Sequence, residues 1–154
     1  ALSRALSQVL VSAEIWGRHF YSGTKLPIRI CIANDLENGM DLPVSDLSWK
    51  ILDEGKVIAS GSQIIPTIRH YSRWWLEPEI ILPAKLSSGR TDAKLVFTLN
   101  NNGKQIAENE YKIMIATKEW AESPVNGTKN ITLVDSENIK ESFDFLGINK
   151  SSFP

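Results

Sequence analysis

The side chains best suited to acid–base, nucleophilic or metal chemistry are few and widely spaced in this sequence. Neither of its two histidines, His19 and His70, has a second histidine or a cysteine at the spacing that metal sites use. We expect both histidines to be solvated residues in separate loops. The single cysteine, Cys31, lies in an apolar run, where a small buried hydrophobe is a better interpretation than a reactive thiol. The sequence also lacks a Gly-x-Ser-x-Gly elbow, a glycine-rich phosphate loop and a His-Glu-x-x-His motif, so it predicts no catalytic residue, metal site or cofactor.

Aromatic side chains gather in two short clusters that could bind a ligand or a protein surface. The clusters contain Trp16, His19 and Tyr21 in the first, and His70, Tyr71, Trp74 and Trp75 in the second. Neighbouring residues of a strand face opposite sides, so one of Trp74 and Trp75 is expected to leave the core. An exposed ring can stack on the apolar face of a sugar, fill a contact with a neighbouring domain, or pack locally in the core or a loop. Of these three interpretations we favour the interdomain contact.

Strands must position these clusters, because apolar and polar residues alternate with a period of two along most of the chain. The alternating runs extend from Val9 to Ile15, Leu26 to Ile32, Leu47 to Ile51, Trp74 to Leu82, Ala93 to Leu99, and Asn109 to Ile115. Tight-turn sequences at Asp53–Lys56 and Asn101–Lys104 predict two hairpins. We therefore predict an all-β fold over residues 1–120, an antiparallel β-sandwich of the immunoglobulin or fibronectin III kind. Trp49 lies in the third predicted strand, where it is expected to pack between the sheets.

Residues 121–154 do not fit the sandwich pattern. A polar linker precedes a short apolar run at Ile131–Val134, which predicts one more strand. A helix is expected from Glu137, with apolar residues on one face and Gly147 at its end. This strand and helix either dock on the sandwich or begin a following domain, and we favour the second interpretation.

The composition fits one ordinary globular domain and excludes several classes of protein. The chain has 154 residues, of which 42% are hydrophobic and 23% charged, with 17 basic against 18 acidic side chains. It is too short for a (β/α)₈ barrel of roughly 250 residues. Its net charge of -1 gives no field that would attract nucleic acid or an anionic membrane. We therefore expect no nucleic acid as a partner. No stretch approaches the roughly 20 apolar residues of a membrane-spanning helix, so we also expect no membrane insertion.

The amino-acid sequences of the predicted strands and their order along the chain resemble those of a known family. The stretches that carry the resemblance are Val9–Ser12, Gly23–Asn34, Leu47–Ile51, Gly55–Gly61, Lys94–Leu99, Asn109–Ile113 and Ala116–Trp120. Together they resemble an immunoglobulin-like domain of family 2 glycoside hydrolases, as found in the large multidomain β-galactosidase-like enzymes of bacteria. The tail after Trp120 lies outside the resemblance.

The resemblance implies a parent enzyme in which a jelly roll, immunoglobulin-like sandwiches and a catalytic barrel follow one another along one chain. Two glutamates of the barrel would perform retaining hydrolysis of glycosidic bonds, and neither has a counterpart here. This chain would then be a non-catalytic accessory domain whose partners are the neighbouring domains of the parent glycosidase, in the periplasm or outside the cell. Two alternatives stay open. One is a carbohydrate-binding module that stacks sugar on Trp16, Tyr21, Trp74 or Trp75, and the other is an adhesin-like or protein-interaction sandwich, whose first sign would be self-association through an exposed edge strand.

Overall fold

The computed structural model describes residues 7–121, 131–132 and 150–151, and the chain divides into two compact units. The first unit is Ala1–Thr117 and the second is Lys118–Pro154. In the second unit a short helix, α2 (Lys118–Ala121), precedes β9 (Ile131–Thr132), which pairs in parallel with β10 (Lys150–Ser151). β9 covers the first two residues of the strand predicted at Ile131–Val134, whereas the helix predicted from Glu137 lies outside the described residues.

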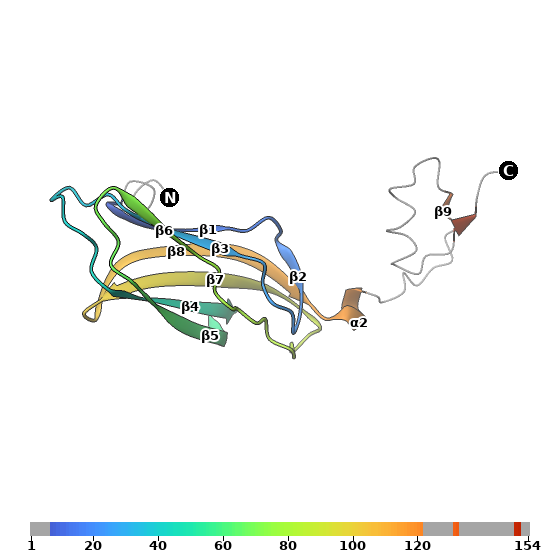
Figure 1. The fold of residues 1–154 in the computed structure, drawn as a ribbon. Helices are drawn as coiled ribbons and strands as arrows, with labels where there is room; N and C mark the ends of the chain where they lie inside the picture. Colours follow the sequence, from blue (N-terminus) through green and yellow to red (C-terminus); the bar gives the residue numbers. More distant parts are fainter. Residues whose placement is uncertain (1–6, 122–130, 133–149, 152–154) are drawn as a thin grey trace. The chain divides into compact units, whose positions relative to one another are not determined.

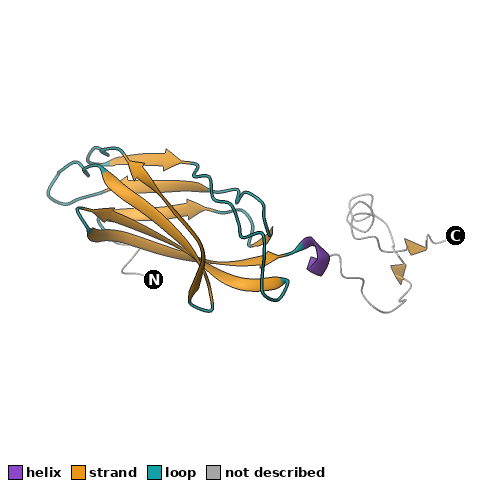
Figure 2. Ribbon diagram, turned by 90° about the horizontal axis from the view of Figure 1, so that it is seen from below, coloured by secondary structure: helices purple, strands orange, loops and turns teal. Residues whose placement is uncertain are grey.

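The first unit is a β-sandwich, which confirms the predicted fold class (Figures 1 and 2). Its strands are β1 (Val9–Glu14), β2 (His19–Tyr21), β3 (Arg29–Asn34), β4 (Ser45–Asp53), β5 (Lys56–Ile65), β6 (Ser72–Leu76), β7 (Arg90–Asn101) and β8 (Lys104–Ala116). One sheet has three strands in the order β1-β3-β6, and the other has five in the order β2-β8-β7-β4-β5. Neighbouring strands of the sandwich are antiparallel, as predicted, except for β2 and β8, which run parallel.

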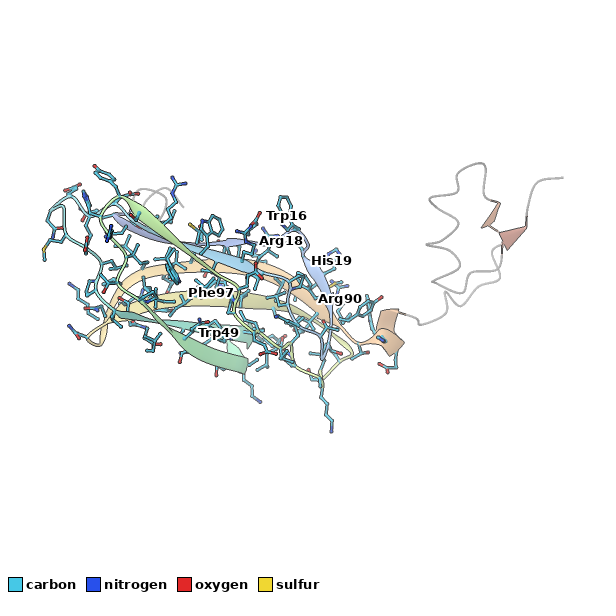
Figure 3. The ribbon with its side chains drawn as sticks, in the orientation of Figure 1. Trp16, Arg18, His19, Trp49, Arg90 and Phe97 are labelled. Atoms are coloured by element: carbon cyan, nitrogen blue, oxygen red, sulfur yellow. The ribbon has the colours of Figure 1, made fainter. Side chains whose placement is uncertain are left out.

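The core lies between the two sheets and follows the predicted alternation. On β7 the side chains of Ala93, Leu95, Phe97 and Leu99 are buried, while the residues between them are exposed or half-buried. Trp49 on β4 is opposite Phe97 and is half-buried against the same core, as expected for a packing tryptophan (Figure 3). Apolar area removed from water stabilises the fold by roughly 25 cal/mol per Å², so these inward faces hold the sheets together.

Both predicted hairpins are present, because their central residues can adopt a left-handed backbone. Glu54 and Gly55 have φ of 47° and 85° between β4 and β5, and Asn102 and Gly103 have φ of 48° and 76° between β7 and β8. Two consecutive positive φ values define the type I′ turn, whose twist matches that of the adjoining strands.

Two predicted strands and one predicted loop are wrong in detail. β3 begins at Arg29 rather than at Leu26, and β6 ends at Leu76 rather than at Leu82. The missing parts contain prolines, which cannot donate a ladder hydrogen bond. Outside the named strands, the apolar residues Leu26, Ile28, Ile80 and Leu82 are still buried, whereas Ile81 is exposed. His19 lies in β2 rather than in a loop, because it pairs with Met114 of β8.

Candidate functional site

The first aromatic cluster lies where the chain passes from one sheet to the other. β1 belongs to the three-stranded sheet and β2 to the five-stranded sheet, and Trp16 is in the connection between them. The side chain of Trp16 is 89% exposed and projects away from the ribbon (Figure 3). His19 is exposed and Tyr21 half-buried on β2, where they pair with Met114 and Ala116 of β8.

The second cluster begins in the turn before β6. The rings of His70 and Tyr71 are 4.1 Å apart between centroids, and Tyr71 is exposed with a φ of 55°. The backbone N–H of Tyr71 donates a hydrogen bond of 2.8 Å to the carbonyl oxygen of Asn34, and the N–H of His70 donates one of 2.9 Å to Oδ1 of Asp41. These bonds hold the turn at the end of β3.

The structure does not bring Trp16 of the first cluster together with His70 and Tyr71 of the second. The register pairs Glu14, just before Trp16, with Arg29 at the start of β3. Asn34, at the other end of β3, pairs with Ser72 just after Tyr71. The length of β3 therefore separates Trp16 from the His70–Tyr71 pair.

Trp74 and Trp75 lie on β6, which is an edge strand of the three-stranded sheet. Trp74 pairs with the buried Ile32 and so faces the inside, whereas Trp75 pairs with Cys31 and faces outward. The expected opposite orientations are present, but both side chains are half-exposed, at 43% for Trp74 and 47% for Trp75. Trp74 keeps solvent contact because the inner face of an edge strand is covered only in part.

The outer face of the three-stranded sheet carries a charged and aromatic surface that we call the Trp75 face. It is formed by the outward residues Leu10, Ser12 and Glu14 of β1, Arg29, Cys31 and Ala33 of β3, and Arg73, Trp75 and the adjoining Glu77. The guanidinium carbon of Arg29 lies 4.8 Å from the centroid of a Trp75 ring. The same guanidinium is 3.4 Å from Glu14 and 3.6 Å from Glu77. Arg29 therefore covers one side of the indole while two carboxylates hold it in place.

Cys31 lies in the middle of this face and is buried, as predicted. Burial raises the pKa of its thiol above the usual value, although the nearby charge of Arg73 and a hydrogen bond with Ser12 act in the opposite direction. A protonated buried thiol is a poor nucleophile, so Cys31 contributes packing here.

A shallow hollow of about 880 Å³ lies over β2, β7 and β8. His19 and Arg18 line it together with Lys94 and Glu110, whose charged groups are 3.3 Å apart. Within residues 7–121, 131–132 and 150–151, no three side chains of histidine, cysteine, aspartate or glutamate gather closely enough to hold a metal ion. In the same part of the chain, no helix has the length and apolar character needed to cross a membrane.

Sequence reasoning missed the residues that organise the Trp75 face. Arg29 and Glu14 were recognisable as outward residues of two strands, but their contact depends on the register between β1 and β3. Glu77 follows β6, far along the chain, and its proximity to Arg29 comes from the pairing of β3 with β6. A search for opposite charges at the ends of predicted strands is the one signal that could have found this cluster.

Comparison with known proteins supports the fold assignment. No protein-family model and no curated protein matches the sequence. The sporulation control protein Spo0M of Bacillus subtilis is 12% identical with a TM-score of 0.50, and the alignment covers 75% of this chain and 52% of that one. The chain therefore spans about half of the Spo0M chain, and the similarity shows a shared fold.

Two further solved structures are similar to this chain with lower TM-scores. The CARDB domain of PF1109 from Pyrococcus furiosus, solved with di-metal ions, is 9% identical with a TM-score of 0.48, and the alignment covers 73% of this chain and 98% of that one. A glycosyl hydrolase family 2 member from Bacteroides cellulosilyticus is 17% identical with a TM-score of 0.44, over 71% of this chain and 14% of that one.

Proposed function

We propose that this chain is a non-catalytic accessory β-sandwich of a multidomain glycoside hydrolase, and that it contacts neighbouring domains through the Trp75 face. The sequence resemblance over residues 1–120 supports the link to family 2. Hydrolysis of the glycosidic bond would take place in a barrel domain elsewhere in the parent, so no residue of this chain has a catalytic role. On the basis of the resemblance, we expect the parent to act in the periplasm or outside the cell, in carbohydrate metabolism.

The single observation that carries this proposal is the arrangement of Arg29 over Trp75. Tryptophan and arginine are the residue types most enriched in the energetically important parts of protein interfaces. Here they are already held in contact by Glu14 and Glu77, so little side-chain freedom would be lost on binding. The face contains two arginines and two glutamates, a balance that suits a protein surface better than a phosphate backbone.

The distribution of the exposed rings favours a domain contact over a sugar-binding platform. Rings that bind one oligosaccharide must present their faces on one surface, since the sugar stacks on them in sequence. Trp74 and Trp75 face opposite sides of β6, and Trp16 lies at the opposite end of β3 from Tyr71. One side of Trp75 is also covered by Arg29.

The experiment compares the isolated chain with the whole protein encoded by its gene. In the isolated chain we expect Trp75→Ala to lower the free energy of unfolding by about 1–3 kcal/mol, from the buried half of the indole and its cation–π contact with Arg29. In the whole protein the same substitution should lower the stability of this domain by clearly more. Lys94→Ala is the matched control, because its exposed pair with Glu110 contributes only about 0–1 kcal/mol in either context. Equal effects of Trp75→Ala in the two contexts would contradict the proposed contact.

A titration with sugars tests the carbohydrate-binding alternative. We expect the tryptophan fluorescence of the isolated chain to stay unchanged with galactans, xylans and mannans at millimolar sugar. A saturable shift that Trp74→Ala or Trp75→Ala abolishes would favour the binding module instead.

A further inference from the structure

We propose that two copies of this chain associate through β5, which pairs antiparallel with the β5 strand of the second copy about a two-fold axis at Gly61. β5 is the last strand of the five-stranded sheet, and among the described strands it pairs with β4 alone (Figure 1). The backbone groups along its other side are therefore available to a further strand. This inference is independent of the proposed role in a glycosidase.

β5 lacks most of the features that keep edge strands from pairing. Exposed edges usually carry charged side chains, proline or a bulge. From Val57 to Ile65 the strand has no charged residue and no proline, and Ile64 is 66% exposed. The one register shift lies at the hairpin end, between Ile51 and Leu52 of β4, so the strand from Ala59 onward is regular.

The sequence of β5 is suited to a partner identical to itself. An antiparallel pairing centred on Gly61 places Ser60 of each copy opposite Ser62 of the other, so small uncharged side chains meet at the axis. Val57 and Ile64 are the exposed large apolar residues of β5, and they lie on either side of Gly61. The same axis brings Val57 of one copy near Ile64 of the other at both ends of the pairing. Such self-complementarity is what a two-fold interface requires.

The opposite sheet leaves room for the second copy. It has three strands against five, and the inward side of β5 is buried in the core at Ile65 but open to solvent toward the middle of the strand. Gln63, opposite the buried Leu47, is exposed, and Gly61, opposite Trp49, is half-buried. The three-stranded sheet therefore leaves the middle of β5 uncovered, around Gly61 and Gln63, where a further strand can be added beside it.

The area of contact predicts a weak dimer. A strand rises about 3.4 Å per residue, so the regular part from Ala59 to Ile65 is about 24 Å long. With a sheet about 10 Å thick, pairing removes on the order of 500 Å² from solvent in total, before side chains beyond the strands are counted. This area is below the roughly 1,200 Å² that stable complexes bury, so we expect a dissociation constant in the upper micromolar range.

Sedimentation equilibrium of the full chain, from about 10 μM to about 1 mM, tests the proposal. We expect a monomer–dimer equilibrium that stops at the dimer, because the two-fold pairing uses the free edge of β5 in both copies. The variant S60E/S62E places like charges opposite each other across the axis, and we expect at least tenfold weaker association. In the matched variant S60E/S62K each introduced carboxylate faces an introduced amine, so dimers should form at least as readily as in the wild type.

Both variants alter exposed residues on the outer face of β5, and circular dichroism should show that each keeps the fold. A wild-type chain that is monomeric at every concentration would overturn the proposal. Equal association of the wild type and both variants would also overturn it, because the contact would then lie elsewhere.

Discussion

The indole of Trp49 lies against Gly61 across the β4–β5 pair, so closely that a Cβ atom at Gly61 would come within 2.8 Å of Cε2 of the ring. Gly61 therefore gives the tryptophan the space it needs to turn toward the core. The fit between these two residues fixes the position of the half-buried ring at the edge of the sandwich.

Gly61→Ala should destabilise the sandwich by about 1–3 kcal/mol, because the added methyl group forces the indole of Trp49 out of its position. Urea unfolding at low micromolar concentration measures the loss. Ser60→Ala on the exposed face of β5 is the control, with an expected change within about 0.5 kcal/mol. In a Trp49→Phe background, Gly61→Ala should cost clearly less. The same cost in both backgrounds would contradict the steric explanation.

Tyr111→Phe should cost about 1–3 kcal/mol, because the phenol oxygen accepts a hydrogen bond from the backbone N–H of Ala13, at 2.7 Å. This bond joins β8 of one sheet to β1 of the other, and its loss leaves the N–H of Ala13 without that acceptor. Tyr71→Phe is the matched control, since Tyr71 is exposed. Thermal unfolding of the two variants gives the comparison, and equal midpoints would show that the hydroxyl of Tyr111 has no structural role.

Asn34→Ala should cost about 2–3 kcal/mol, because the fully buried side chain leaves several backbone groups without their partner when it is removed. Its amide nitrogen donates to the carbonyl oxygens of Met40 and Ile68 at 3.1 and 3.0 Å, and its oxygen accepts from the N–H of Leu36. Asp35→Ala, at an exposed neighbouring position, should change the free energy of unfolding little. An Asn34→Ala variant as stable as Asp35→Ala would contradict this role.

The Cys31 thiol should react slowly with a disulfide reagent at pH 8 in the folded chain, and much faster after unfolding in urea. Burial raises its pKa, so the folded state holds the thiol proton more tightly than the unfolded state does. The contribution of Cys31 to stability is therefore fully present below the usual thiol pKa and is lost as the pH rises through the raised value. Arg73→Ala removes the charge that lowers this pKa, so the folded variant should react more slowly still. Equal rates for the folded and unfolded chains would contradict the buried state of Cys31.

Local features of the sandwich could be predicted because they depend on neighbouring residues. The Glu54–Gly55 turn and the alternation along β7 each depend on residues that are consecutive in the sequence, and both are present in the structure. The passage of the chain between sheets at Trp16 could not be predicted, since β1 and β2 separate only through their pairing with β3 and β8.

The candidate site could be predicted in its residue types and not in its arrangement. The opposite orientations of Trp74 and Trp75 followed from their adjacency on a strand. The similar exposure of the two side chains could not be predicted in this way, because it depends on β6 being an edge strand. The position of Arg29 over Trp75 results from the register between β3 and β6, which the alternation within each strand does not reveal.

The coding sequence on both sides of this chain, translated in frame, tests the accessory-domain proposal most directly. We predict a catalytic barrel in the same reading frame, with two glutamates placed for retaining hydrolysis. An in-frame polypeptide with no glycosidase domain would contradict the proposal.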